Sequence, residues 1–152
     1  MAKATKTNAS REQLIAGLND DLAREYQAII AYVAYSQVLT GAEYMAIAKE
    51  LEVHAGEELQ HALTIAKHID YLGGTPTVTP KPVAPPKDEK QMLRADLENE
   101  TETIREYRVR LHQAEACDEF AIAEDIREIL RQEQEHQIDL ATALGIDVPR
   151  RS

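Results

Sequence analysis

The sequence predicts an all-α protein built as a bundle of four long helices, and three observations point to this fold class. The chain has 152 residues, of which 43% are hydrophobic and 29% charged, enough for one folded domain with a real core. It contains no Trp and one Phe, and it is rich in Ala, Leu, Ile and Glu, which favours helices over sheets. Every proline except Pro149 falls within residues 73–86, so the stretches on either side are free to form long helices.

The half of the chain before this proline-rich segment predicts two helices. Ser10, with Gln13 three residues later, has the pattern of a helix N-cap, so the first helix is expected to begin there and to end near the turn that Gly41 permits. A second helix is expected to follow as far as about Leu72. Residues 1–9 are expected to form a flexible N-terminal tail.

Residues 73–88 are expected to form a long crossover linker. About 14 residues of extended, polyproline-like chain reach roughly 43 Å, which is also about the length of a helix of 29 residues. The linker can therefore run along the whole bundle, so that the second and third helices lie parallel.

The half of the chain after the linker predicts two more helices. The third is expected from about Lys87 to the region of Ala116, and the fourth is expected to end near Leu144, before Gly145. The bundle domain then covers residues 10–146, and residues 147–152 form a C-terminal tail without a fifth helix.

An internal repeat relates the two halves at a shift of 75 residues. The shift superposes the pair Glu58 and His61 on Glu133 and His136. It also superposes the core pattern of the first helix on that of the third: Leu18, Asp21, Leu22, Glu25, Ile29 and Tyr32 align with Leu93, Asp96, Leu97, Glu100, Ile104 and Tyr107. Two hairpins related in this way pack about a pseudo-two-fold axis, which brings equivalent side chains together.

Carboxylates and imidazoles fall on the inward, apolar stripes of the expected helices: Glu25, Glu58, His61, Glu100, Glu133 and His136. Buried carboxylates are unfavourable unless positive charge compensates them, and two divalent cations carry the charge that four glutamates require. Oxygen and imidazole ligands suit iron or manganese, while the lack of thiolates disfavours structural zinc. In each half an inward Glu precedes the Glu-x-x-His by 33 residues, so the pattern predicts a di-metal site within one bundle.

At these residues the chain resembles the ferritin-like superfamily, and most closely its bacterioferritin branch. The segments that carry the resemblance are Arg24–Gln27, Glu58–His61, Met92–Glu100 and Ile129–His136. The resemblance implies that Glu25 and Glu100 are terminal ligands, that Glu58 and Glu133 bridge two iron ions, and that His61 and His136 bind one iron each. It also implies a ferroxidase and iron-storage protein, which oxidises Fe(II) with dioxygen or hydrogen peroxide and holds Fe(III) mineral inside a shell of identical subunits.

The chain departs from these relatives at several positions. Bacterioferritins have a haem-binding Met directly after the first bridging Glu, where this chain has Leu59, so haem is not expected unless Met45 or Met92 serves a different arrangement. Ferritins of 24 subunits carry a fifth helix, so a shell of twelve is expected here, with 24 subunits or a dimer as the alternatives. Rubrerythrin-like peroxidases have an additional Glu where this chain has Thr103.

Two other functions remain open. One is a non-storing di-iron or manganese oxidase or peroxidase in oxidative-stress defence, and the other is a DNA-protecting mini-ferritin. The net charge of −10 argues against nucleic acid as a main partner, since phosphates would be repelled. A single cysteine cannot form an intrachain disulfide, and no apolar run is long enough for a membrane span, so a reducing cytoplasm is expected.

Two tyrosines and two aspartates near the predicted ligands are candidates for hydrogen bonds to them. Tyr32 and Tyr107 lie two turns beyond Glu25 and Glu100, where each phenol can donate a hydrogen bond to a ligating carboxylate; the alternative is that they fill the core and their hydroxyls bond elsewhere. Asp21 and Asp96 either orient the ligand histidines or lie in solvent.

The remaining histidines and the cysteine have less defined roles. His54 is expected to be a hydrogen-bonded core histidine, with transient iron binding as the alternative. His68 and His112 are expected on the surface, and Cys117 is expected to be a small buried hydrophobe.

Overall fold

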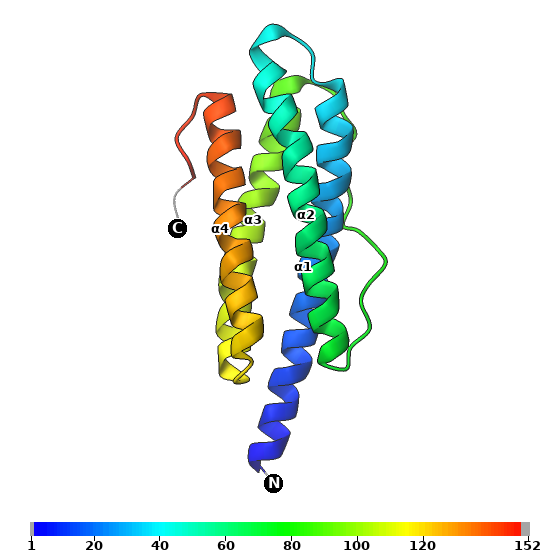
Figure 1. The fold of residues 1–152 in the computed structure, drawn as a ribbon, viewed down its shortest axis with the longest axis vertical. Helices are drawn as coiled ribbons and strands as arrows, with labels where there is room; N and C mark the ends of the chain where they lie inside the picture. Colours follow the sequence, from blue (N-terminus) through cyan, green and yellow to red (C-terminus); the bar gives the residue numbers. More distant parts are fainter. Residues whose placement is uncertain (1, 150–152) are drawn as a thin grey trace.

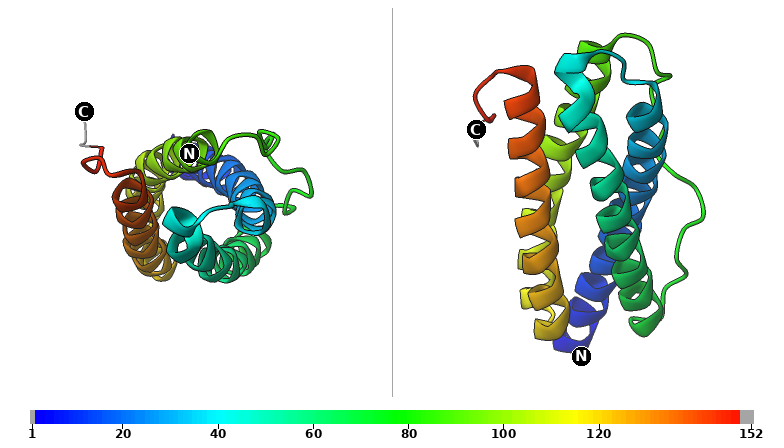
Figure 2. Two further views of the ribbon diagram at one scale, coloured as in Figure 1. Left: turned by 90° about the horizontal axis from the view of Figure 1, so that it is seen from above. Right: turned by 45° about the horizontal axis from the view of Figure 1, so that its top comes forward.

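The computed structural model describes residues 2–149, which form a bundle of four long helices (Figure 1). The elements are α1 (Ala2–Val38), the short 3-10 helix η1 (Ala42–Tyr44), α2 (Met45–Tyr71), α3 (Glu89–Ala116) and α4 (Phe120–Leu144). Seen end-on in Figure 2, α1 packs beside α2 and α3, and α4 packs beside α3 and α2. The predicted all-α fold class is confirmed, and the described residues contain no strand.

α1 begins at Ala2, eight residues before the expected N-cap at Ser10. Residues 2–9 contain neither glycine nor proline, and a helix whose packed part is already formed extends readily because the unfavourable nucleation step is past. The predicted start of the first helix is therefore wrong. Met1, the side chains of residues 2–9, and residues 150–152 of the expected C-terminal tail lie outside the described part of the chain.

The other helix ends agree with the sequence patterns. Gly41, between α1 and α2, has φ of 115°, a backbone conformation that side chains with a Cβ rarely adopt. Asp88 caps α3 by accepting a hydrogen bond of 3.1 Å from the backbone N–H of Gln91. Gly145 ends α4 in the left-handed conformation, with φ of 68°.

The linker between α2 and α3 runs the length of the bundle along α1 (Figure 1). The Asn19 side chain donates to Thr75 O at 3.1 Å, the Lys81 backbone N–H donates to Ala23 O at 3.1 Å, and Tyr35 donates to Ala84 O at 2.5 Å. These acceptors and donors on α1 follow one side of the helix. The linker therefore returns the chain to the end of the bundle at which α2 begins, so α2 and α3 run parallel, as predicted.

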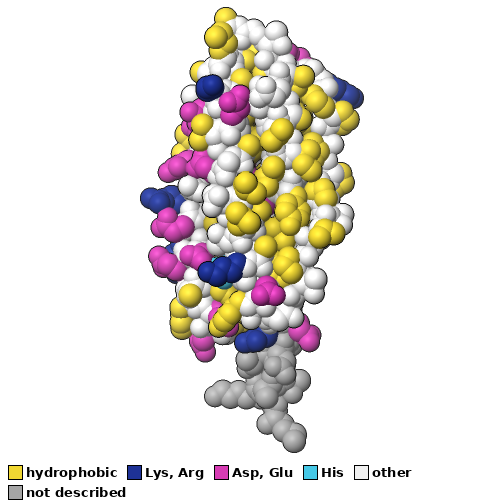
Figure 3. Space-filling model, turned by 45° about the vertical axis from the view of Figure 1, so that its right-hand side comes forward, with side chains coloured by type: hydrophobic (Ala, Val, Ile, Leu, Met, Phe, Trp, Pro, Cys, Tyr) yellow, Lys and Arg dark blue, Asp and Glu magenta, His cyan; other side chains and the backbone are white. Residues whose placement is uncertain are grey.

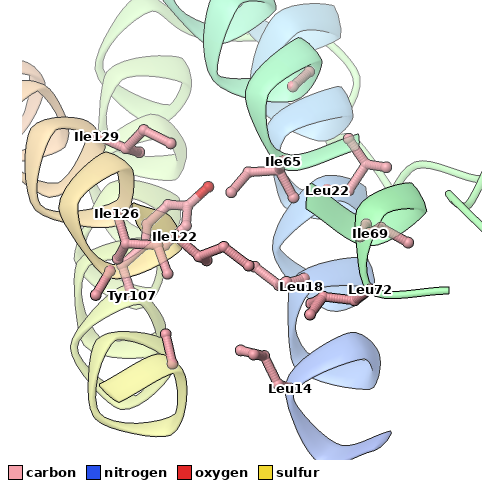
Figure 4. Packing of buried hydrophobic residues seen from close by; sticks show 13 residues of the cluster. Leu14, Leu18, Leu22, Ile65, Ile69, Leu72, Tyr107, Ile122, Ile126 and Ile129 are labelled. Carbon is pink, nitrogen blue, oxygen red and sulfur yellow. The ribbon is translucent and has the colours of Figure 1, made fainter. Parts of the chain in front are cut away.

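Two hydrophobic clusters fill the interior, one toward each end of the bundle. The first contains Leu18 on α1, Ile65 on α2 and Ile126 on α4, whose side chains point toward one another in Figure 4. The second contains Leu51 on α2 and Leu93 on α3. Along each helix, the ionisable residues of the predicted site lie between these clusters. Within the described residues, no helix is both long enough and apolar enough to cross a bilayer.

Candidate metal centre

Six ionisable side chains meet in the middle of the bundle, between the two hydrophobic clusters. α1 and α3 contribute one glutamate each, and α2 and α4 each contribute a glutamate and, one turn later, a histidine: Glu25, Glu100, Glu58, His61, Glu133 and His136. None of these residues is more than 3% exposed. The structure thus brings together all six residues that the sequence singled out, while their binding of metal stays a prediction.

The six side chains form two overlapping groups of potential ligands. One group is Glu25, Glu58, His61 and Glu133, and the other is Glu58, Glu100, Glu133 and His136. Within each group, the potential ligand atoms lie within 4.8 Å of one another. Glu58 and Glu133 belong to both groups, which is the arrangement that two bridging carboxylates would have between two metal ions.

The histidines reach across the bundle to the glutamate of the opposite helix. His61 Nδ1 lies 2.7 Å from Glu133 Oε1, and His136 Nδ1 lies 2.8 Å from Glu58 Oε1. α2 and α4 therefore exchange equivalent contacts, as the pseudo-two-fold repeat predicts.

Many polar atoms of this cluster are buried without a hydrogen-bond partner. Among the described residues, eight nitrogen and oxygen atoms of the six side chains make no hydrogen bond of acceptable geometry, including both carboxylate oxygens of Glu133 and the Nδ1 atoms of His61 and His136, despite the short distances between them. Unpartnered buried polar atoms are rare because each loses its hydration. Carboxylate oxygens and imidazole nitrogens that converge in this way fit two divalent cations of the iron or manganese type.

Four of the six side chains have raised pKa values in this structure, so each binds a proton more tightly than it would in water. Burial raises the pKa of Glu58 well above its ordinary value, and nearby carboxylates, Glu25 foremost, raise it further. Burial and like charge also raise the pKa of Glu133. Although burial disfavours a charged imidazole, contacts with carboxylates outweigh it and raise the pKa of His136 to about 9 and that of His61 in the same direction.

Glu25 and Glu100, which each belong to only one of the two groups and are called the outer glutamates below, accept hydrogen bonds from two tyrosines. Tyr107 on α3 donates to Glu25 Oε1 at 2.6 Å, and Tyr32 on α1 donates to Glu100 Oε1. Both side chains are completely buried or nearly so. The prediction that these phenols support the carboxylates is confirmed, with each tyrosine serving the glutamate of the other hairpin.

The two repeated aspartates do not orient the histidines. Asp21 is buried and accepts from Arg110 Nε at 2.8 Å and from Arg24 at 2.5 Å. Asp96 is also buried, and its Oδ2 has no hydrogen-bond partner among the described residues. Both expectations for this pair are therefore wrong: Asp21 pairs with arginines rather than with a histidine, and both aspartates are buried rather than exposed to solvent.

α4 instead provides the partners of three histidines that lie seven residues apart on α2. The pairs are His54 with Asp139 at 3.1 Å, His61 with Gln132 at 2.5 Å and His68 with Asp125 at 2.7 Å. His54 is the hydrogen-bonded core histidine that was expected. His68 is buried, so its expected surface position is wrong. Gln132 was missed, although the matching spacing of seven on both helices is a signal that could have identified it.

The other singled-out residues lie away from the cluster. Leu59, at the position of the haem-binding Met, is exposed on α2, and Met45 is 72% exposed. Met92 is buried within the second hydrophobic cluster. Cys117 is half-buried and packs against the first hydrophobic cluster, and His112 is exposed as expected.

The one-crossover topology and the doubled Glu and Glu-x-x-His arrangement define a ferritin-like bundle with a carboxylate and histidine cluster at its centre. The chain belongs to the ferritin-like domain family, which it matches over residues 15–147. No curated protein matches the chain.

Solved structures support the same assignment. A ferritin-like diiron-carboxylate protein from Bacillus anthracis str. Ames is 33% identical, with a TM-score of 0.85 over 89% of this chain and 97% of that one. A dodecameric thioferritin, the bacterioferritin-related protein from Bacteroides fragilis, is 26% identical, with a TM-score of 0.82 over 95% and 94% of the two chains. The bacterioferritin of Desulfovibrio desulfuricans, a protein with a diiron site, is 24% identical, with a TM-score of 0.83 over 91% and 82%, and shows the shared fold.

Proposed function

We propose that this protein is a ferroxidase that oxidises Fe(II) at a di-iron centre within each bundle and stores the Fe(III) product in a protein shell. The observation that carries the proposal is the pair of four-residue groups that share Glu58 and Glu133. Two iron ions would occupy these groups, with Glu25 and His61 on one side and Glu100 and His136 on the other. Manganese would fit the same donors.

The chain's own groups have defined tasks in this reaction. The shared carboxylates would hold two Fe(II) ions close together, so that two electrons can pass to one molecule of dioxygen or hydrogen peroxide. The phenols of Tyr32 and Tyr107 fix the outer carboxylates. Burial of the cluster limits access of water, and the bound iron supplies the redox chemistry.

Three observations support storage in a shell. The net charge of −10 would attract Fe(II) and hold nucleating Fe(III). Large hydrophobic side chains are exposed, among them Val33 on α1 and Leu63 on α2, and Figure 3 shows a face on which hydrophobic side chains gather, as expected for contacts between copies. The thioferritin of similar length from Bacteroides fragilis is dodecameric, and we infer twelve subunits here.

The single cysteine is consistent with a cytoplasmic location.

A DNA-protecting role has less support. Each group of potential ligands comes from one chain, whereas the mini-ferritins considered above build their site between subunits. The acidic charge also opposes contact with phosphates.

The test is the rate of Fe(II) oxidation after single replacements of the shared glutamates. In Glu58→Ala and Glu133→Ala, the fast absorbance change after aerobic Fe(II) addition should be lost, a fall of at least about 100-fold. Glu58→Gln, which keeps the shape of the side chain, should lose it as well. Glu124→Ala, at an exposed position on α4, is the matched control and should oxidise Fe(II) at the original rate. Fast oxidation in folded Glu58 and Glu133 variants would refute a ferroxidase centre at this place.

A further inference from the structure

The repeat that builds the centre is broken directly behind its two histidines. Glu57 on α2 and Gln132 on α4 are 75 residues apart and occupy equivalent places, each preceding a shared glutamate. Both side chains are half-buried. A carboxylate and a neutral amide thus stand at two positions that the repeat makes equivalent.

Each of these side chains lies behind the histidine of the opposite helix. Gln132 Oε1 is 2.5 Å from His61 Nε2, and Glu57 Oε1 is 3.4 Å from His136 Nε2. In both rings the other nitrogen, Nδ1, faces the carboxylates of the centre. His61 is therefore backed by a neutral acceptor and His136 by a negative charge.

A second difference favours the same half of the centre. The ring of His54 stacks on His136, with 3.9 Å between ring centroids and 21° between planes. The repeat places Ile129 at the position equivalent to His54, so no second imidazole corresponds to it. The stacking holds the His136 ring in its orientation before any ligand is bound.

A carboxylate behind a ligating imidazole increases the electron donation of the ring and attracts the bound cation, while an amide orients the ring without adding net charge. We propose that the two metal positions have unequal affinity: the position that includes His136 binds a divalent cation more tightly than the one that includes His61, and Glu57 and Gln132 set the difference. The inference rests on the metal centre of the proposed function, and it adds an order of filling. The expected difference is about tenfold, since such outer partners change metal affinity by 10–100-fold.

Anaerobic titration with Mn(II), followed by the electron paramagnetic resonance signal of the free ion, measures both binding steps without oxidation. The unsubstituted protein should show two steps about tenfold apart. Glu57→Gln should weaken the tighter step by about tenfold, and Gln132→Glu should strengthen the weaker step by a similar factor. Glu52→Gln, at an exposed position on the same helix, is the matched control for lost charge and should leave both steps unchanged.

The double exchange Glu57→Gln with Gln132→Glu keeps composition and net charge and should reverse the order of filling. Crystals grown with one Mn(II) per chain should show anomalous density beside His136 in the original protein and beside His61 in the double variant. Equal occupancy in the original protein, or an unchanged order in the double variant, would overturn the inference while leaving the di-metal centre intact. If no Mn(II) bound at all, the centre itself would be refuted, and the inference with it.

Discussion

Tyr107 on α3 donates a hydrogen bond of 2.6 Å to Glu25 on α1, although the two residues are 82 positions apart in the chain. The equivalent bond runs in the opposite direction, from Tyr32 on α1 to Glu100 on α3. Each hairpin therefore donates a hydrogen bond to the outer glutamate of the other hairpin. Because neither hairpin can satisfy its own glutamate in this way, the centre depends on the docking of both halves.

Loss of one of these phenols should weaken the bundle and the centre together. In Tyr107→Phe, a buried carboxylate oxygen loses its donor, which should destabilise the protein by about 1–3 kcal/mol and lower the melting temperature. Affinity for Mn(II) should fall by about tenfold, because Glu25 loses its fixed orientation. Tyr71→Phe, at a position 68% exposed, is the control and should behave as the original. Unchanged melting and binding in Tyr107→Phe would contradict the supporting role.

Metal binding should release protons. The pKa values of Glu58, Glu133, His61 and His136 are all raised by their surroundings, so protons compete with metal ions for these groups. Binding of divalent ions would displace protons from these groups, so affinity for metal should fall as pH falls from 8 to 6. Anaerobic Mn(II) additions to weakly buffered protein with a pH indicator measure the release. Release of fewer than about one proton for two bound ions would show that the cluster is already deprotonated.

Two glycines on helices should respond oppositely to the same substitution. A Cβ on Gly17 would lie 2.0 Å from the Arg110 guanidinium, which pairs with the buried Asp21, whereas nothing lies within 4 Å of a Cβ on Gly56. Gly56→Ala should therefore stabilise the bundle by about 0.5–1 kcal/mol, as helix propensity predicts. Gly17→Ala should lower the melting temperature despite the better propensity, because Arg110 must move from Asp21. Equal gains in both variants would show that Arg110 relocates freely.

The native particle should have a mass of about 200 kDa, which corresponds to twelve chains of 17.0 kDa. A closed shell is expected because ferric product released from a lone bundle would precipitate in the solvent. Light scattering coupled to size-exclusion chromatography measures the mass directly. A particle of about 34 kDa would favour a dimeric, non-storing oxidase, and one of about 400 kDa would show that 24 subunits assemble without the expected fifth helix.

The sequence alone predicted the four helices, apart from the start of the first, as well as the crossover and the convergence of the six ionisable side chains. Helical periodicity places Glu25 and Glu58 on apolar faces, and the 75-residue repeat doubles the pattern, so the convergence of the six side chains follows without coordinates. The proline-rich linker is long enough to run the whole length of the bundle, which is needed when the second and third helices lie parallel, whereas antiparallel helices need only a short loop. These features depend on distances along the chain, so they can be read from the spacing of residues in one sequence.

Only the tertiary structure decided which side chains form hydrogen bonds to the six residues and to their neighbours. Whether Asp21 faces a histidine or an arginine, and whether His61 meets Gln132, depends on the axial register and rotation of one helix against another. Periodicity gives the face of a helix but not its offset along a neighbour. The start of α1 at Ala2 was also beyond the capping pattern, since helix extension from a packed segment can pass a favourable cap.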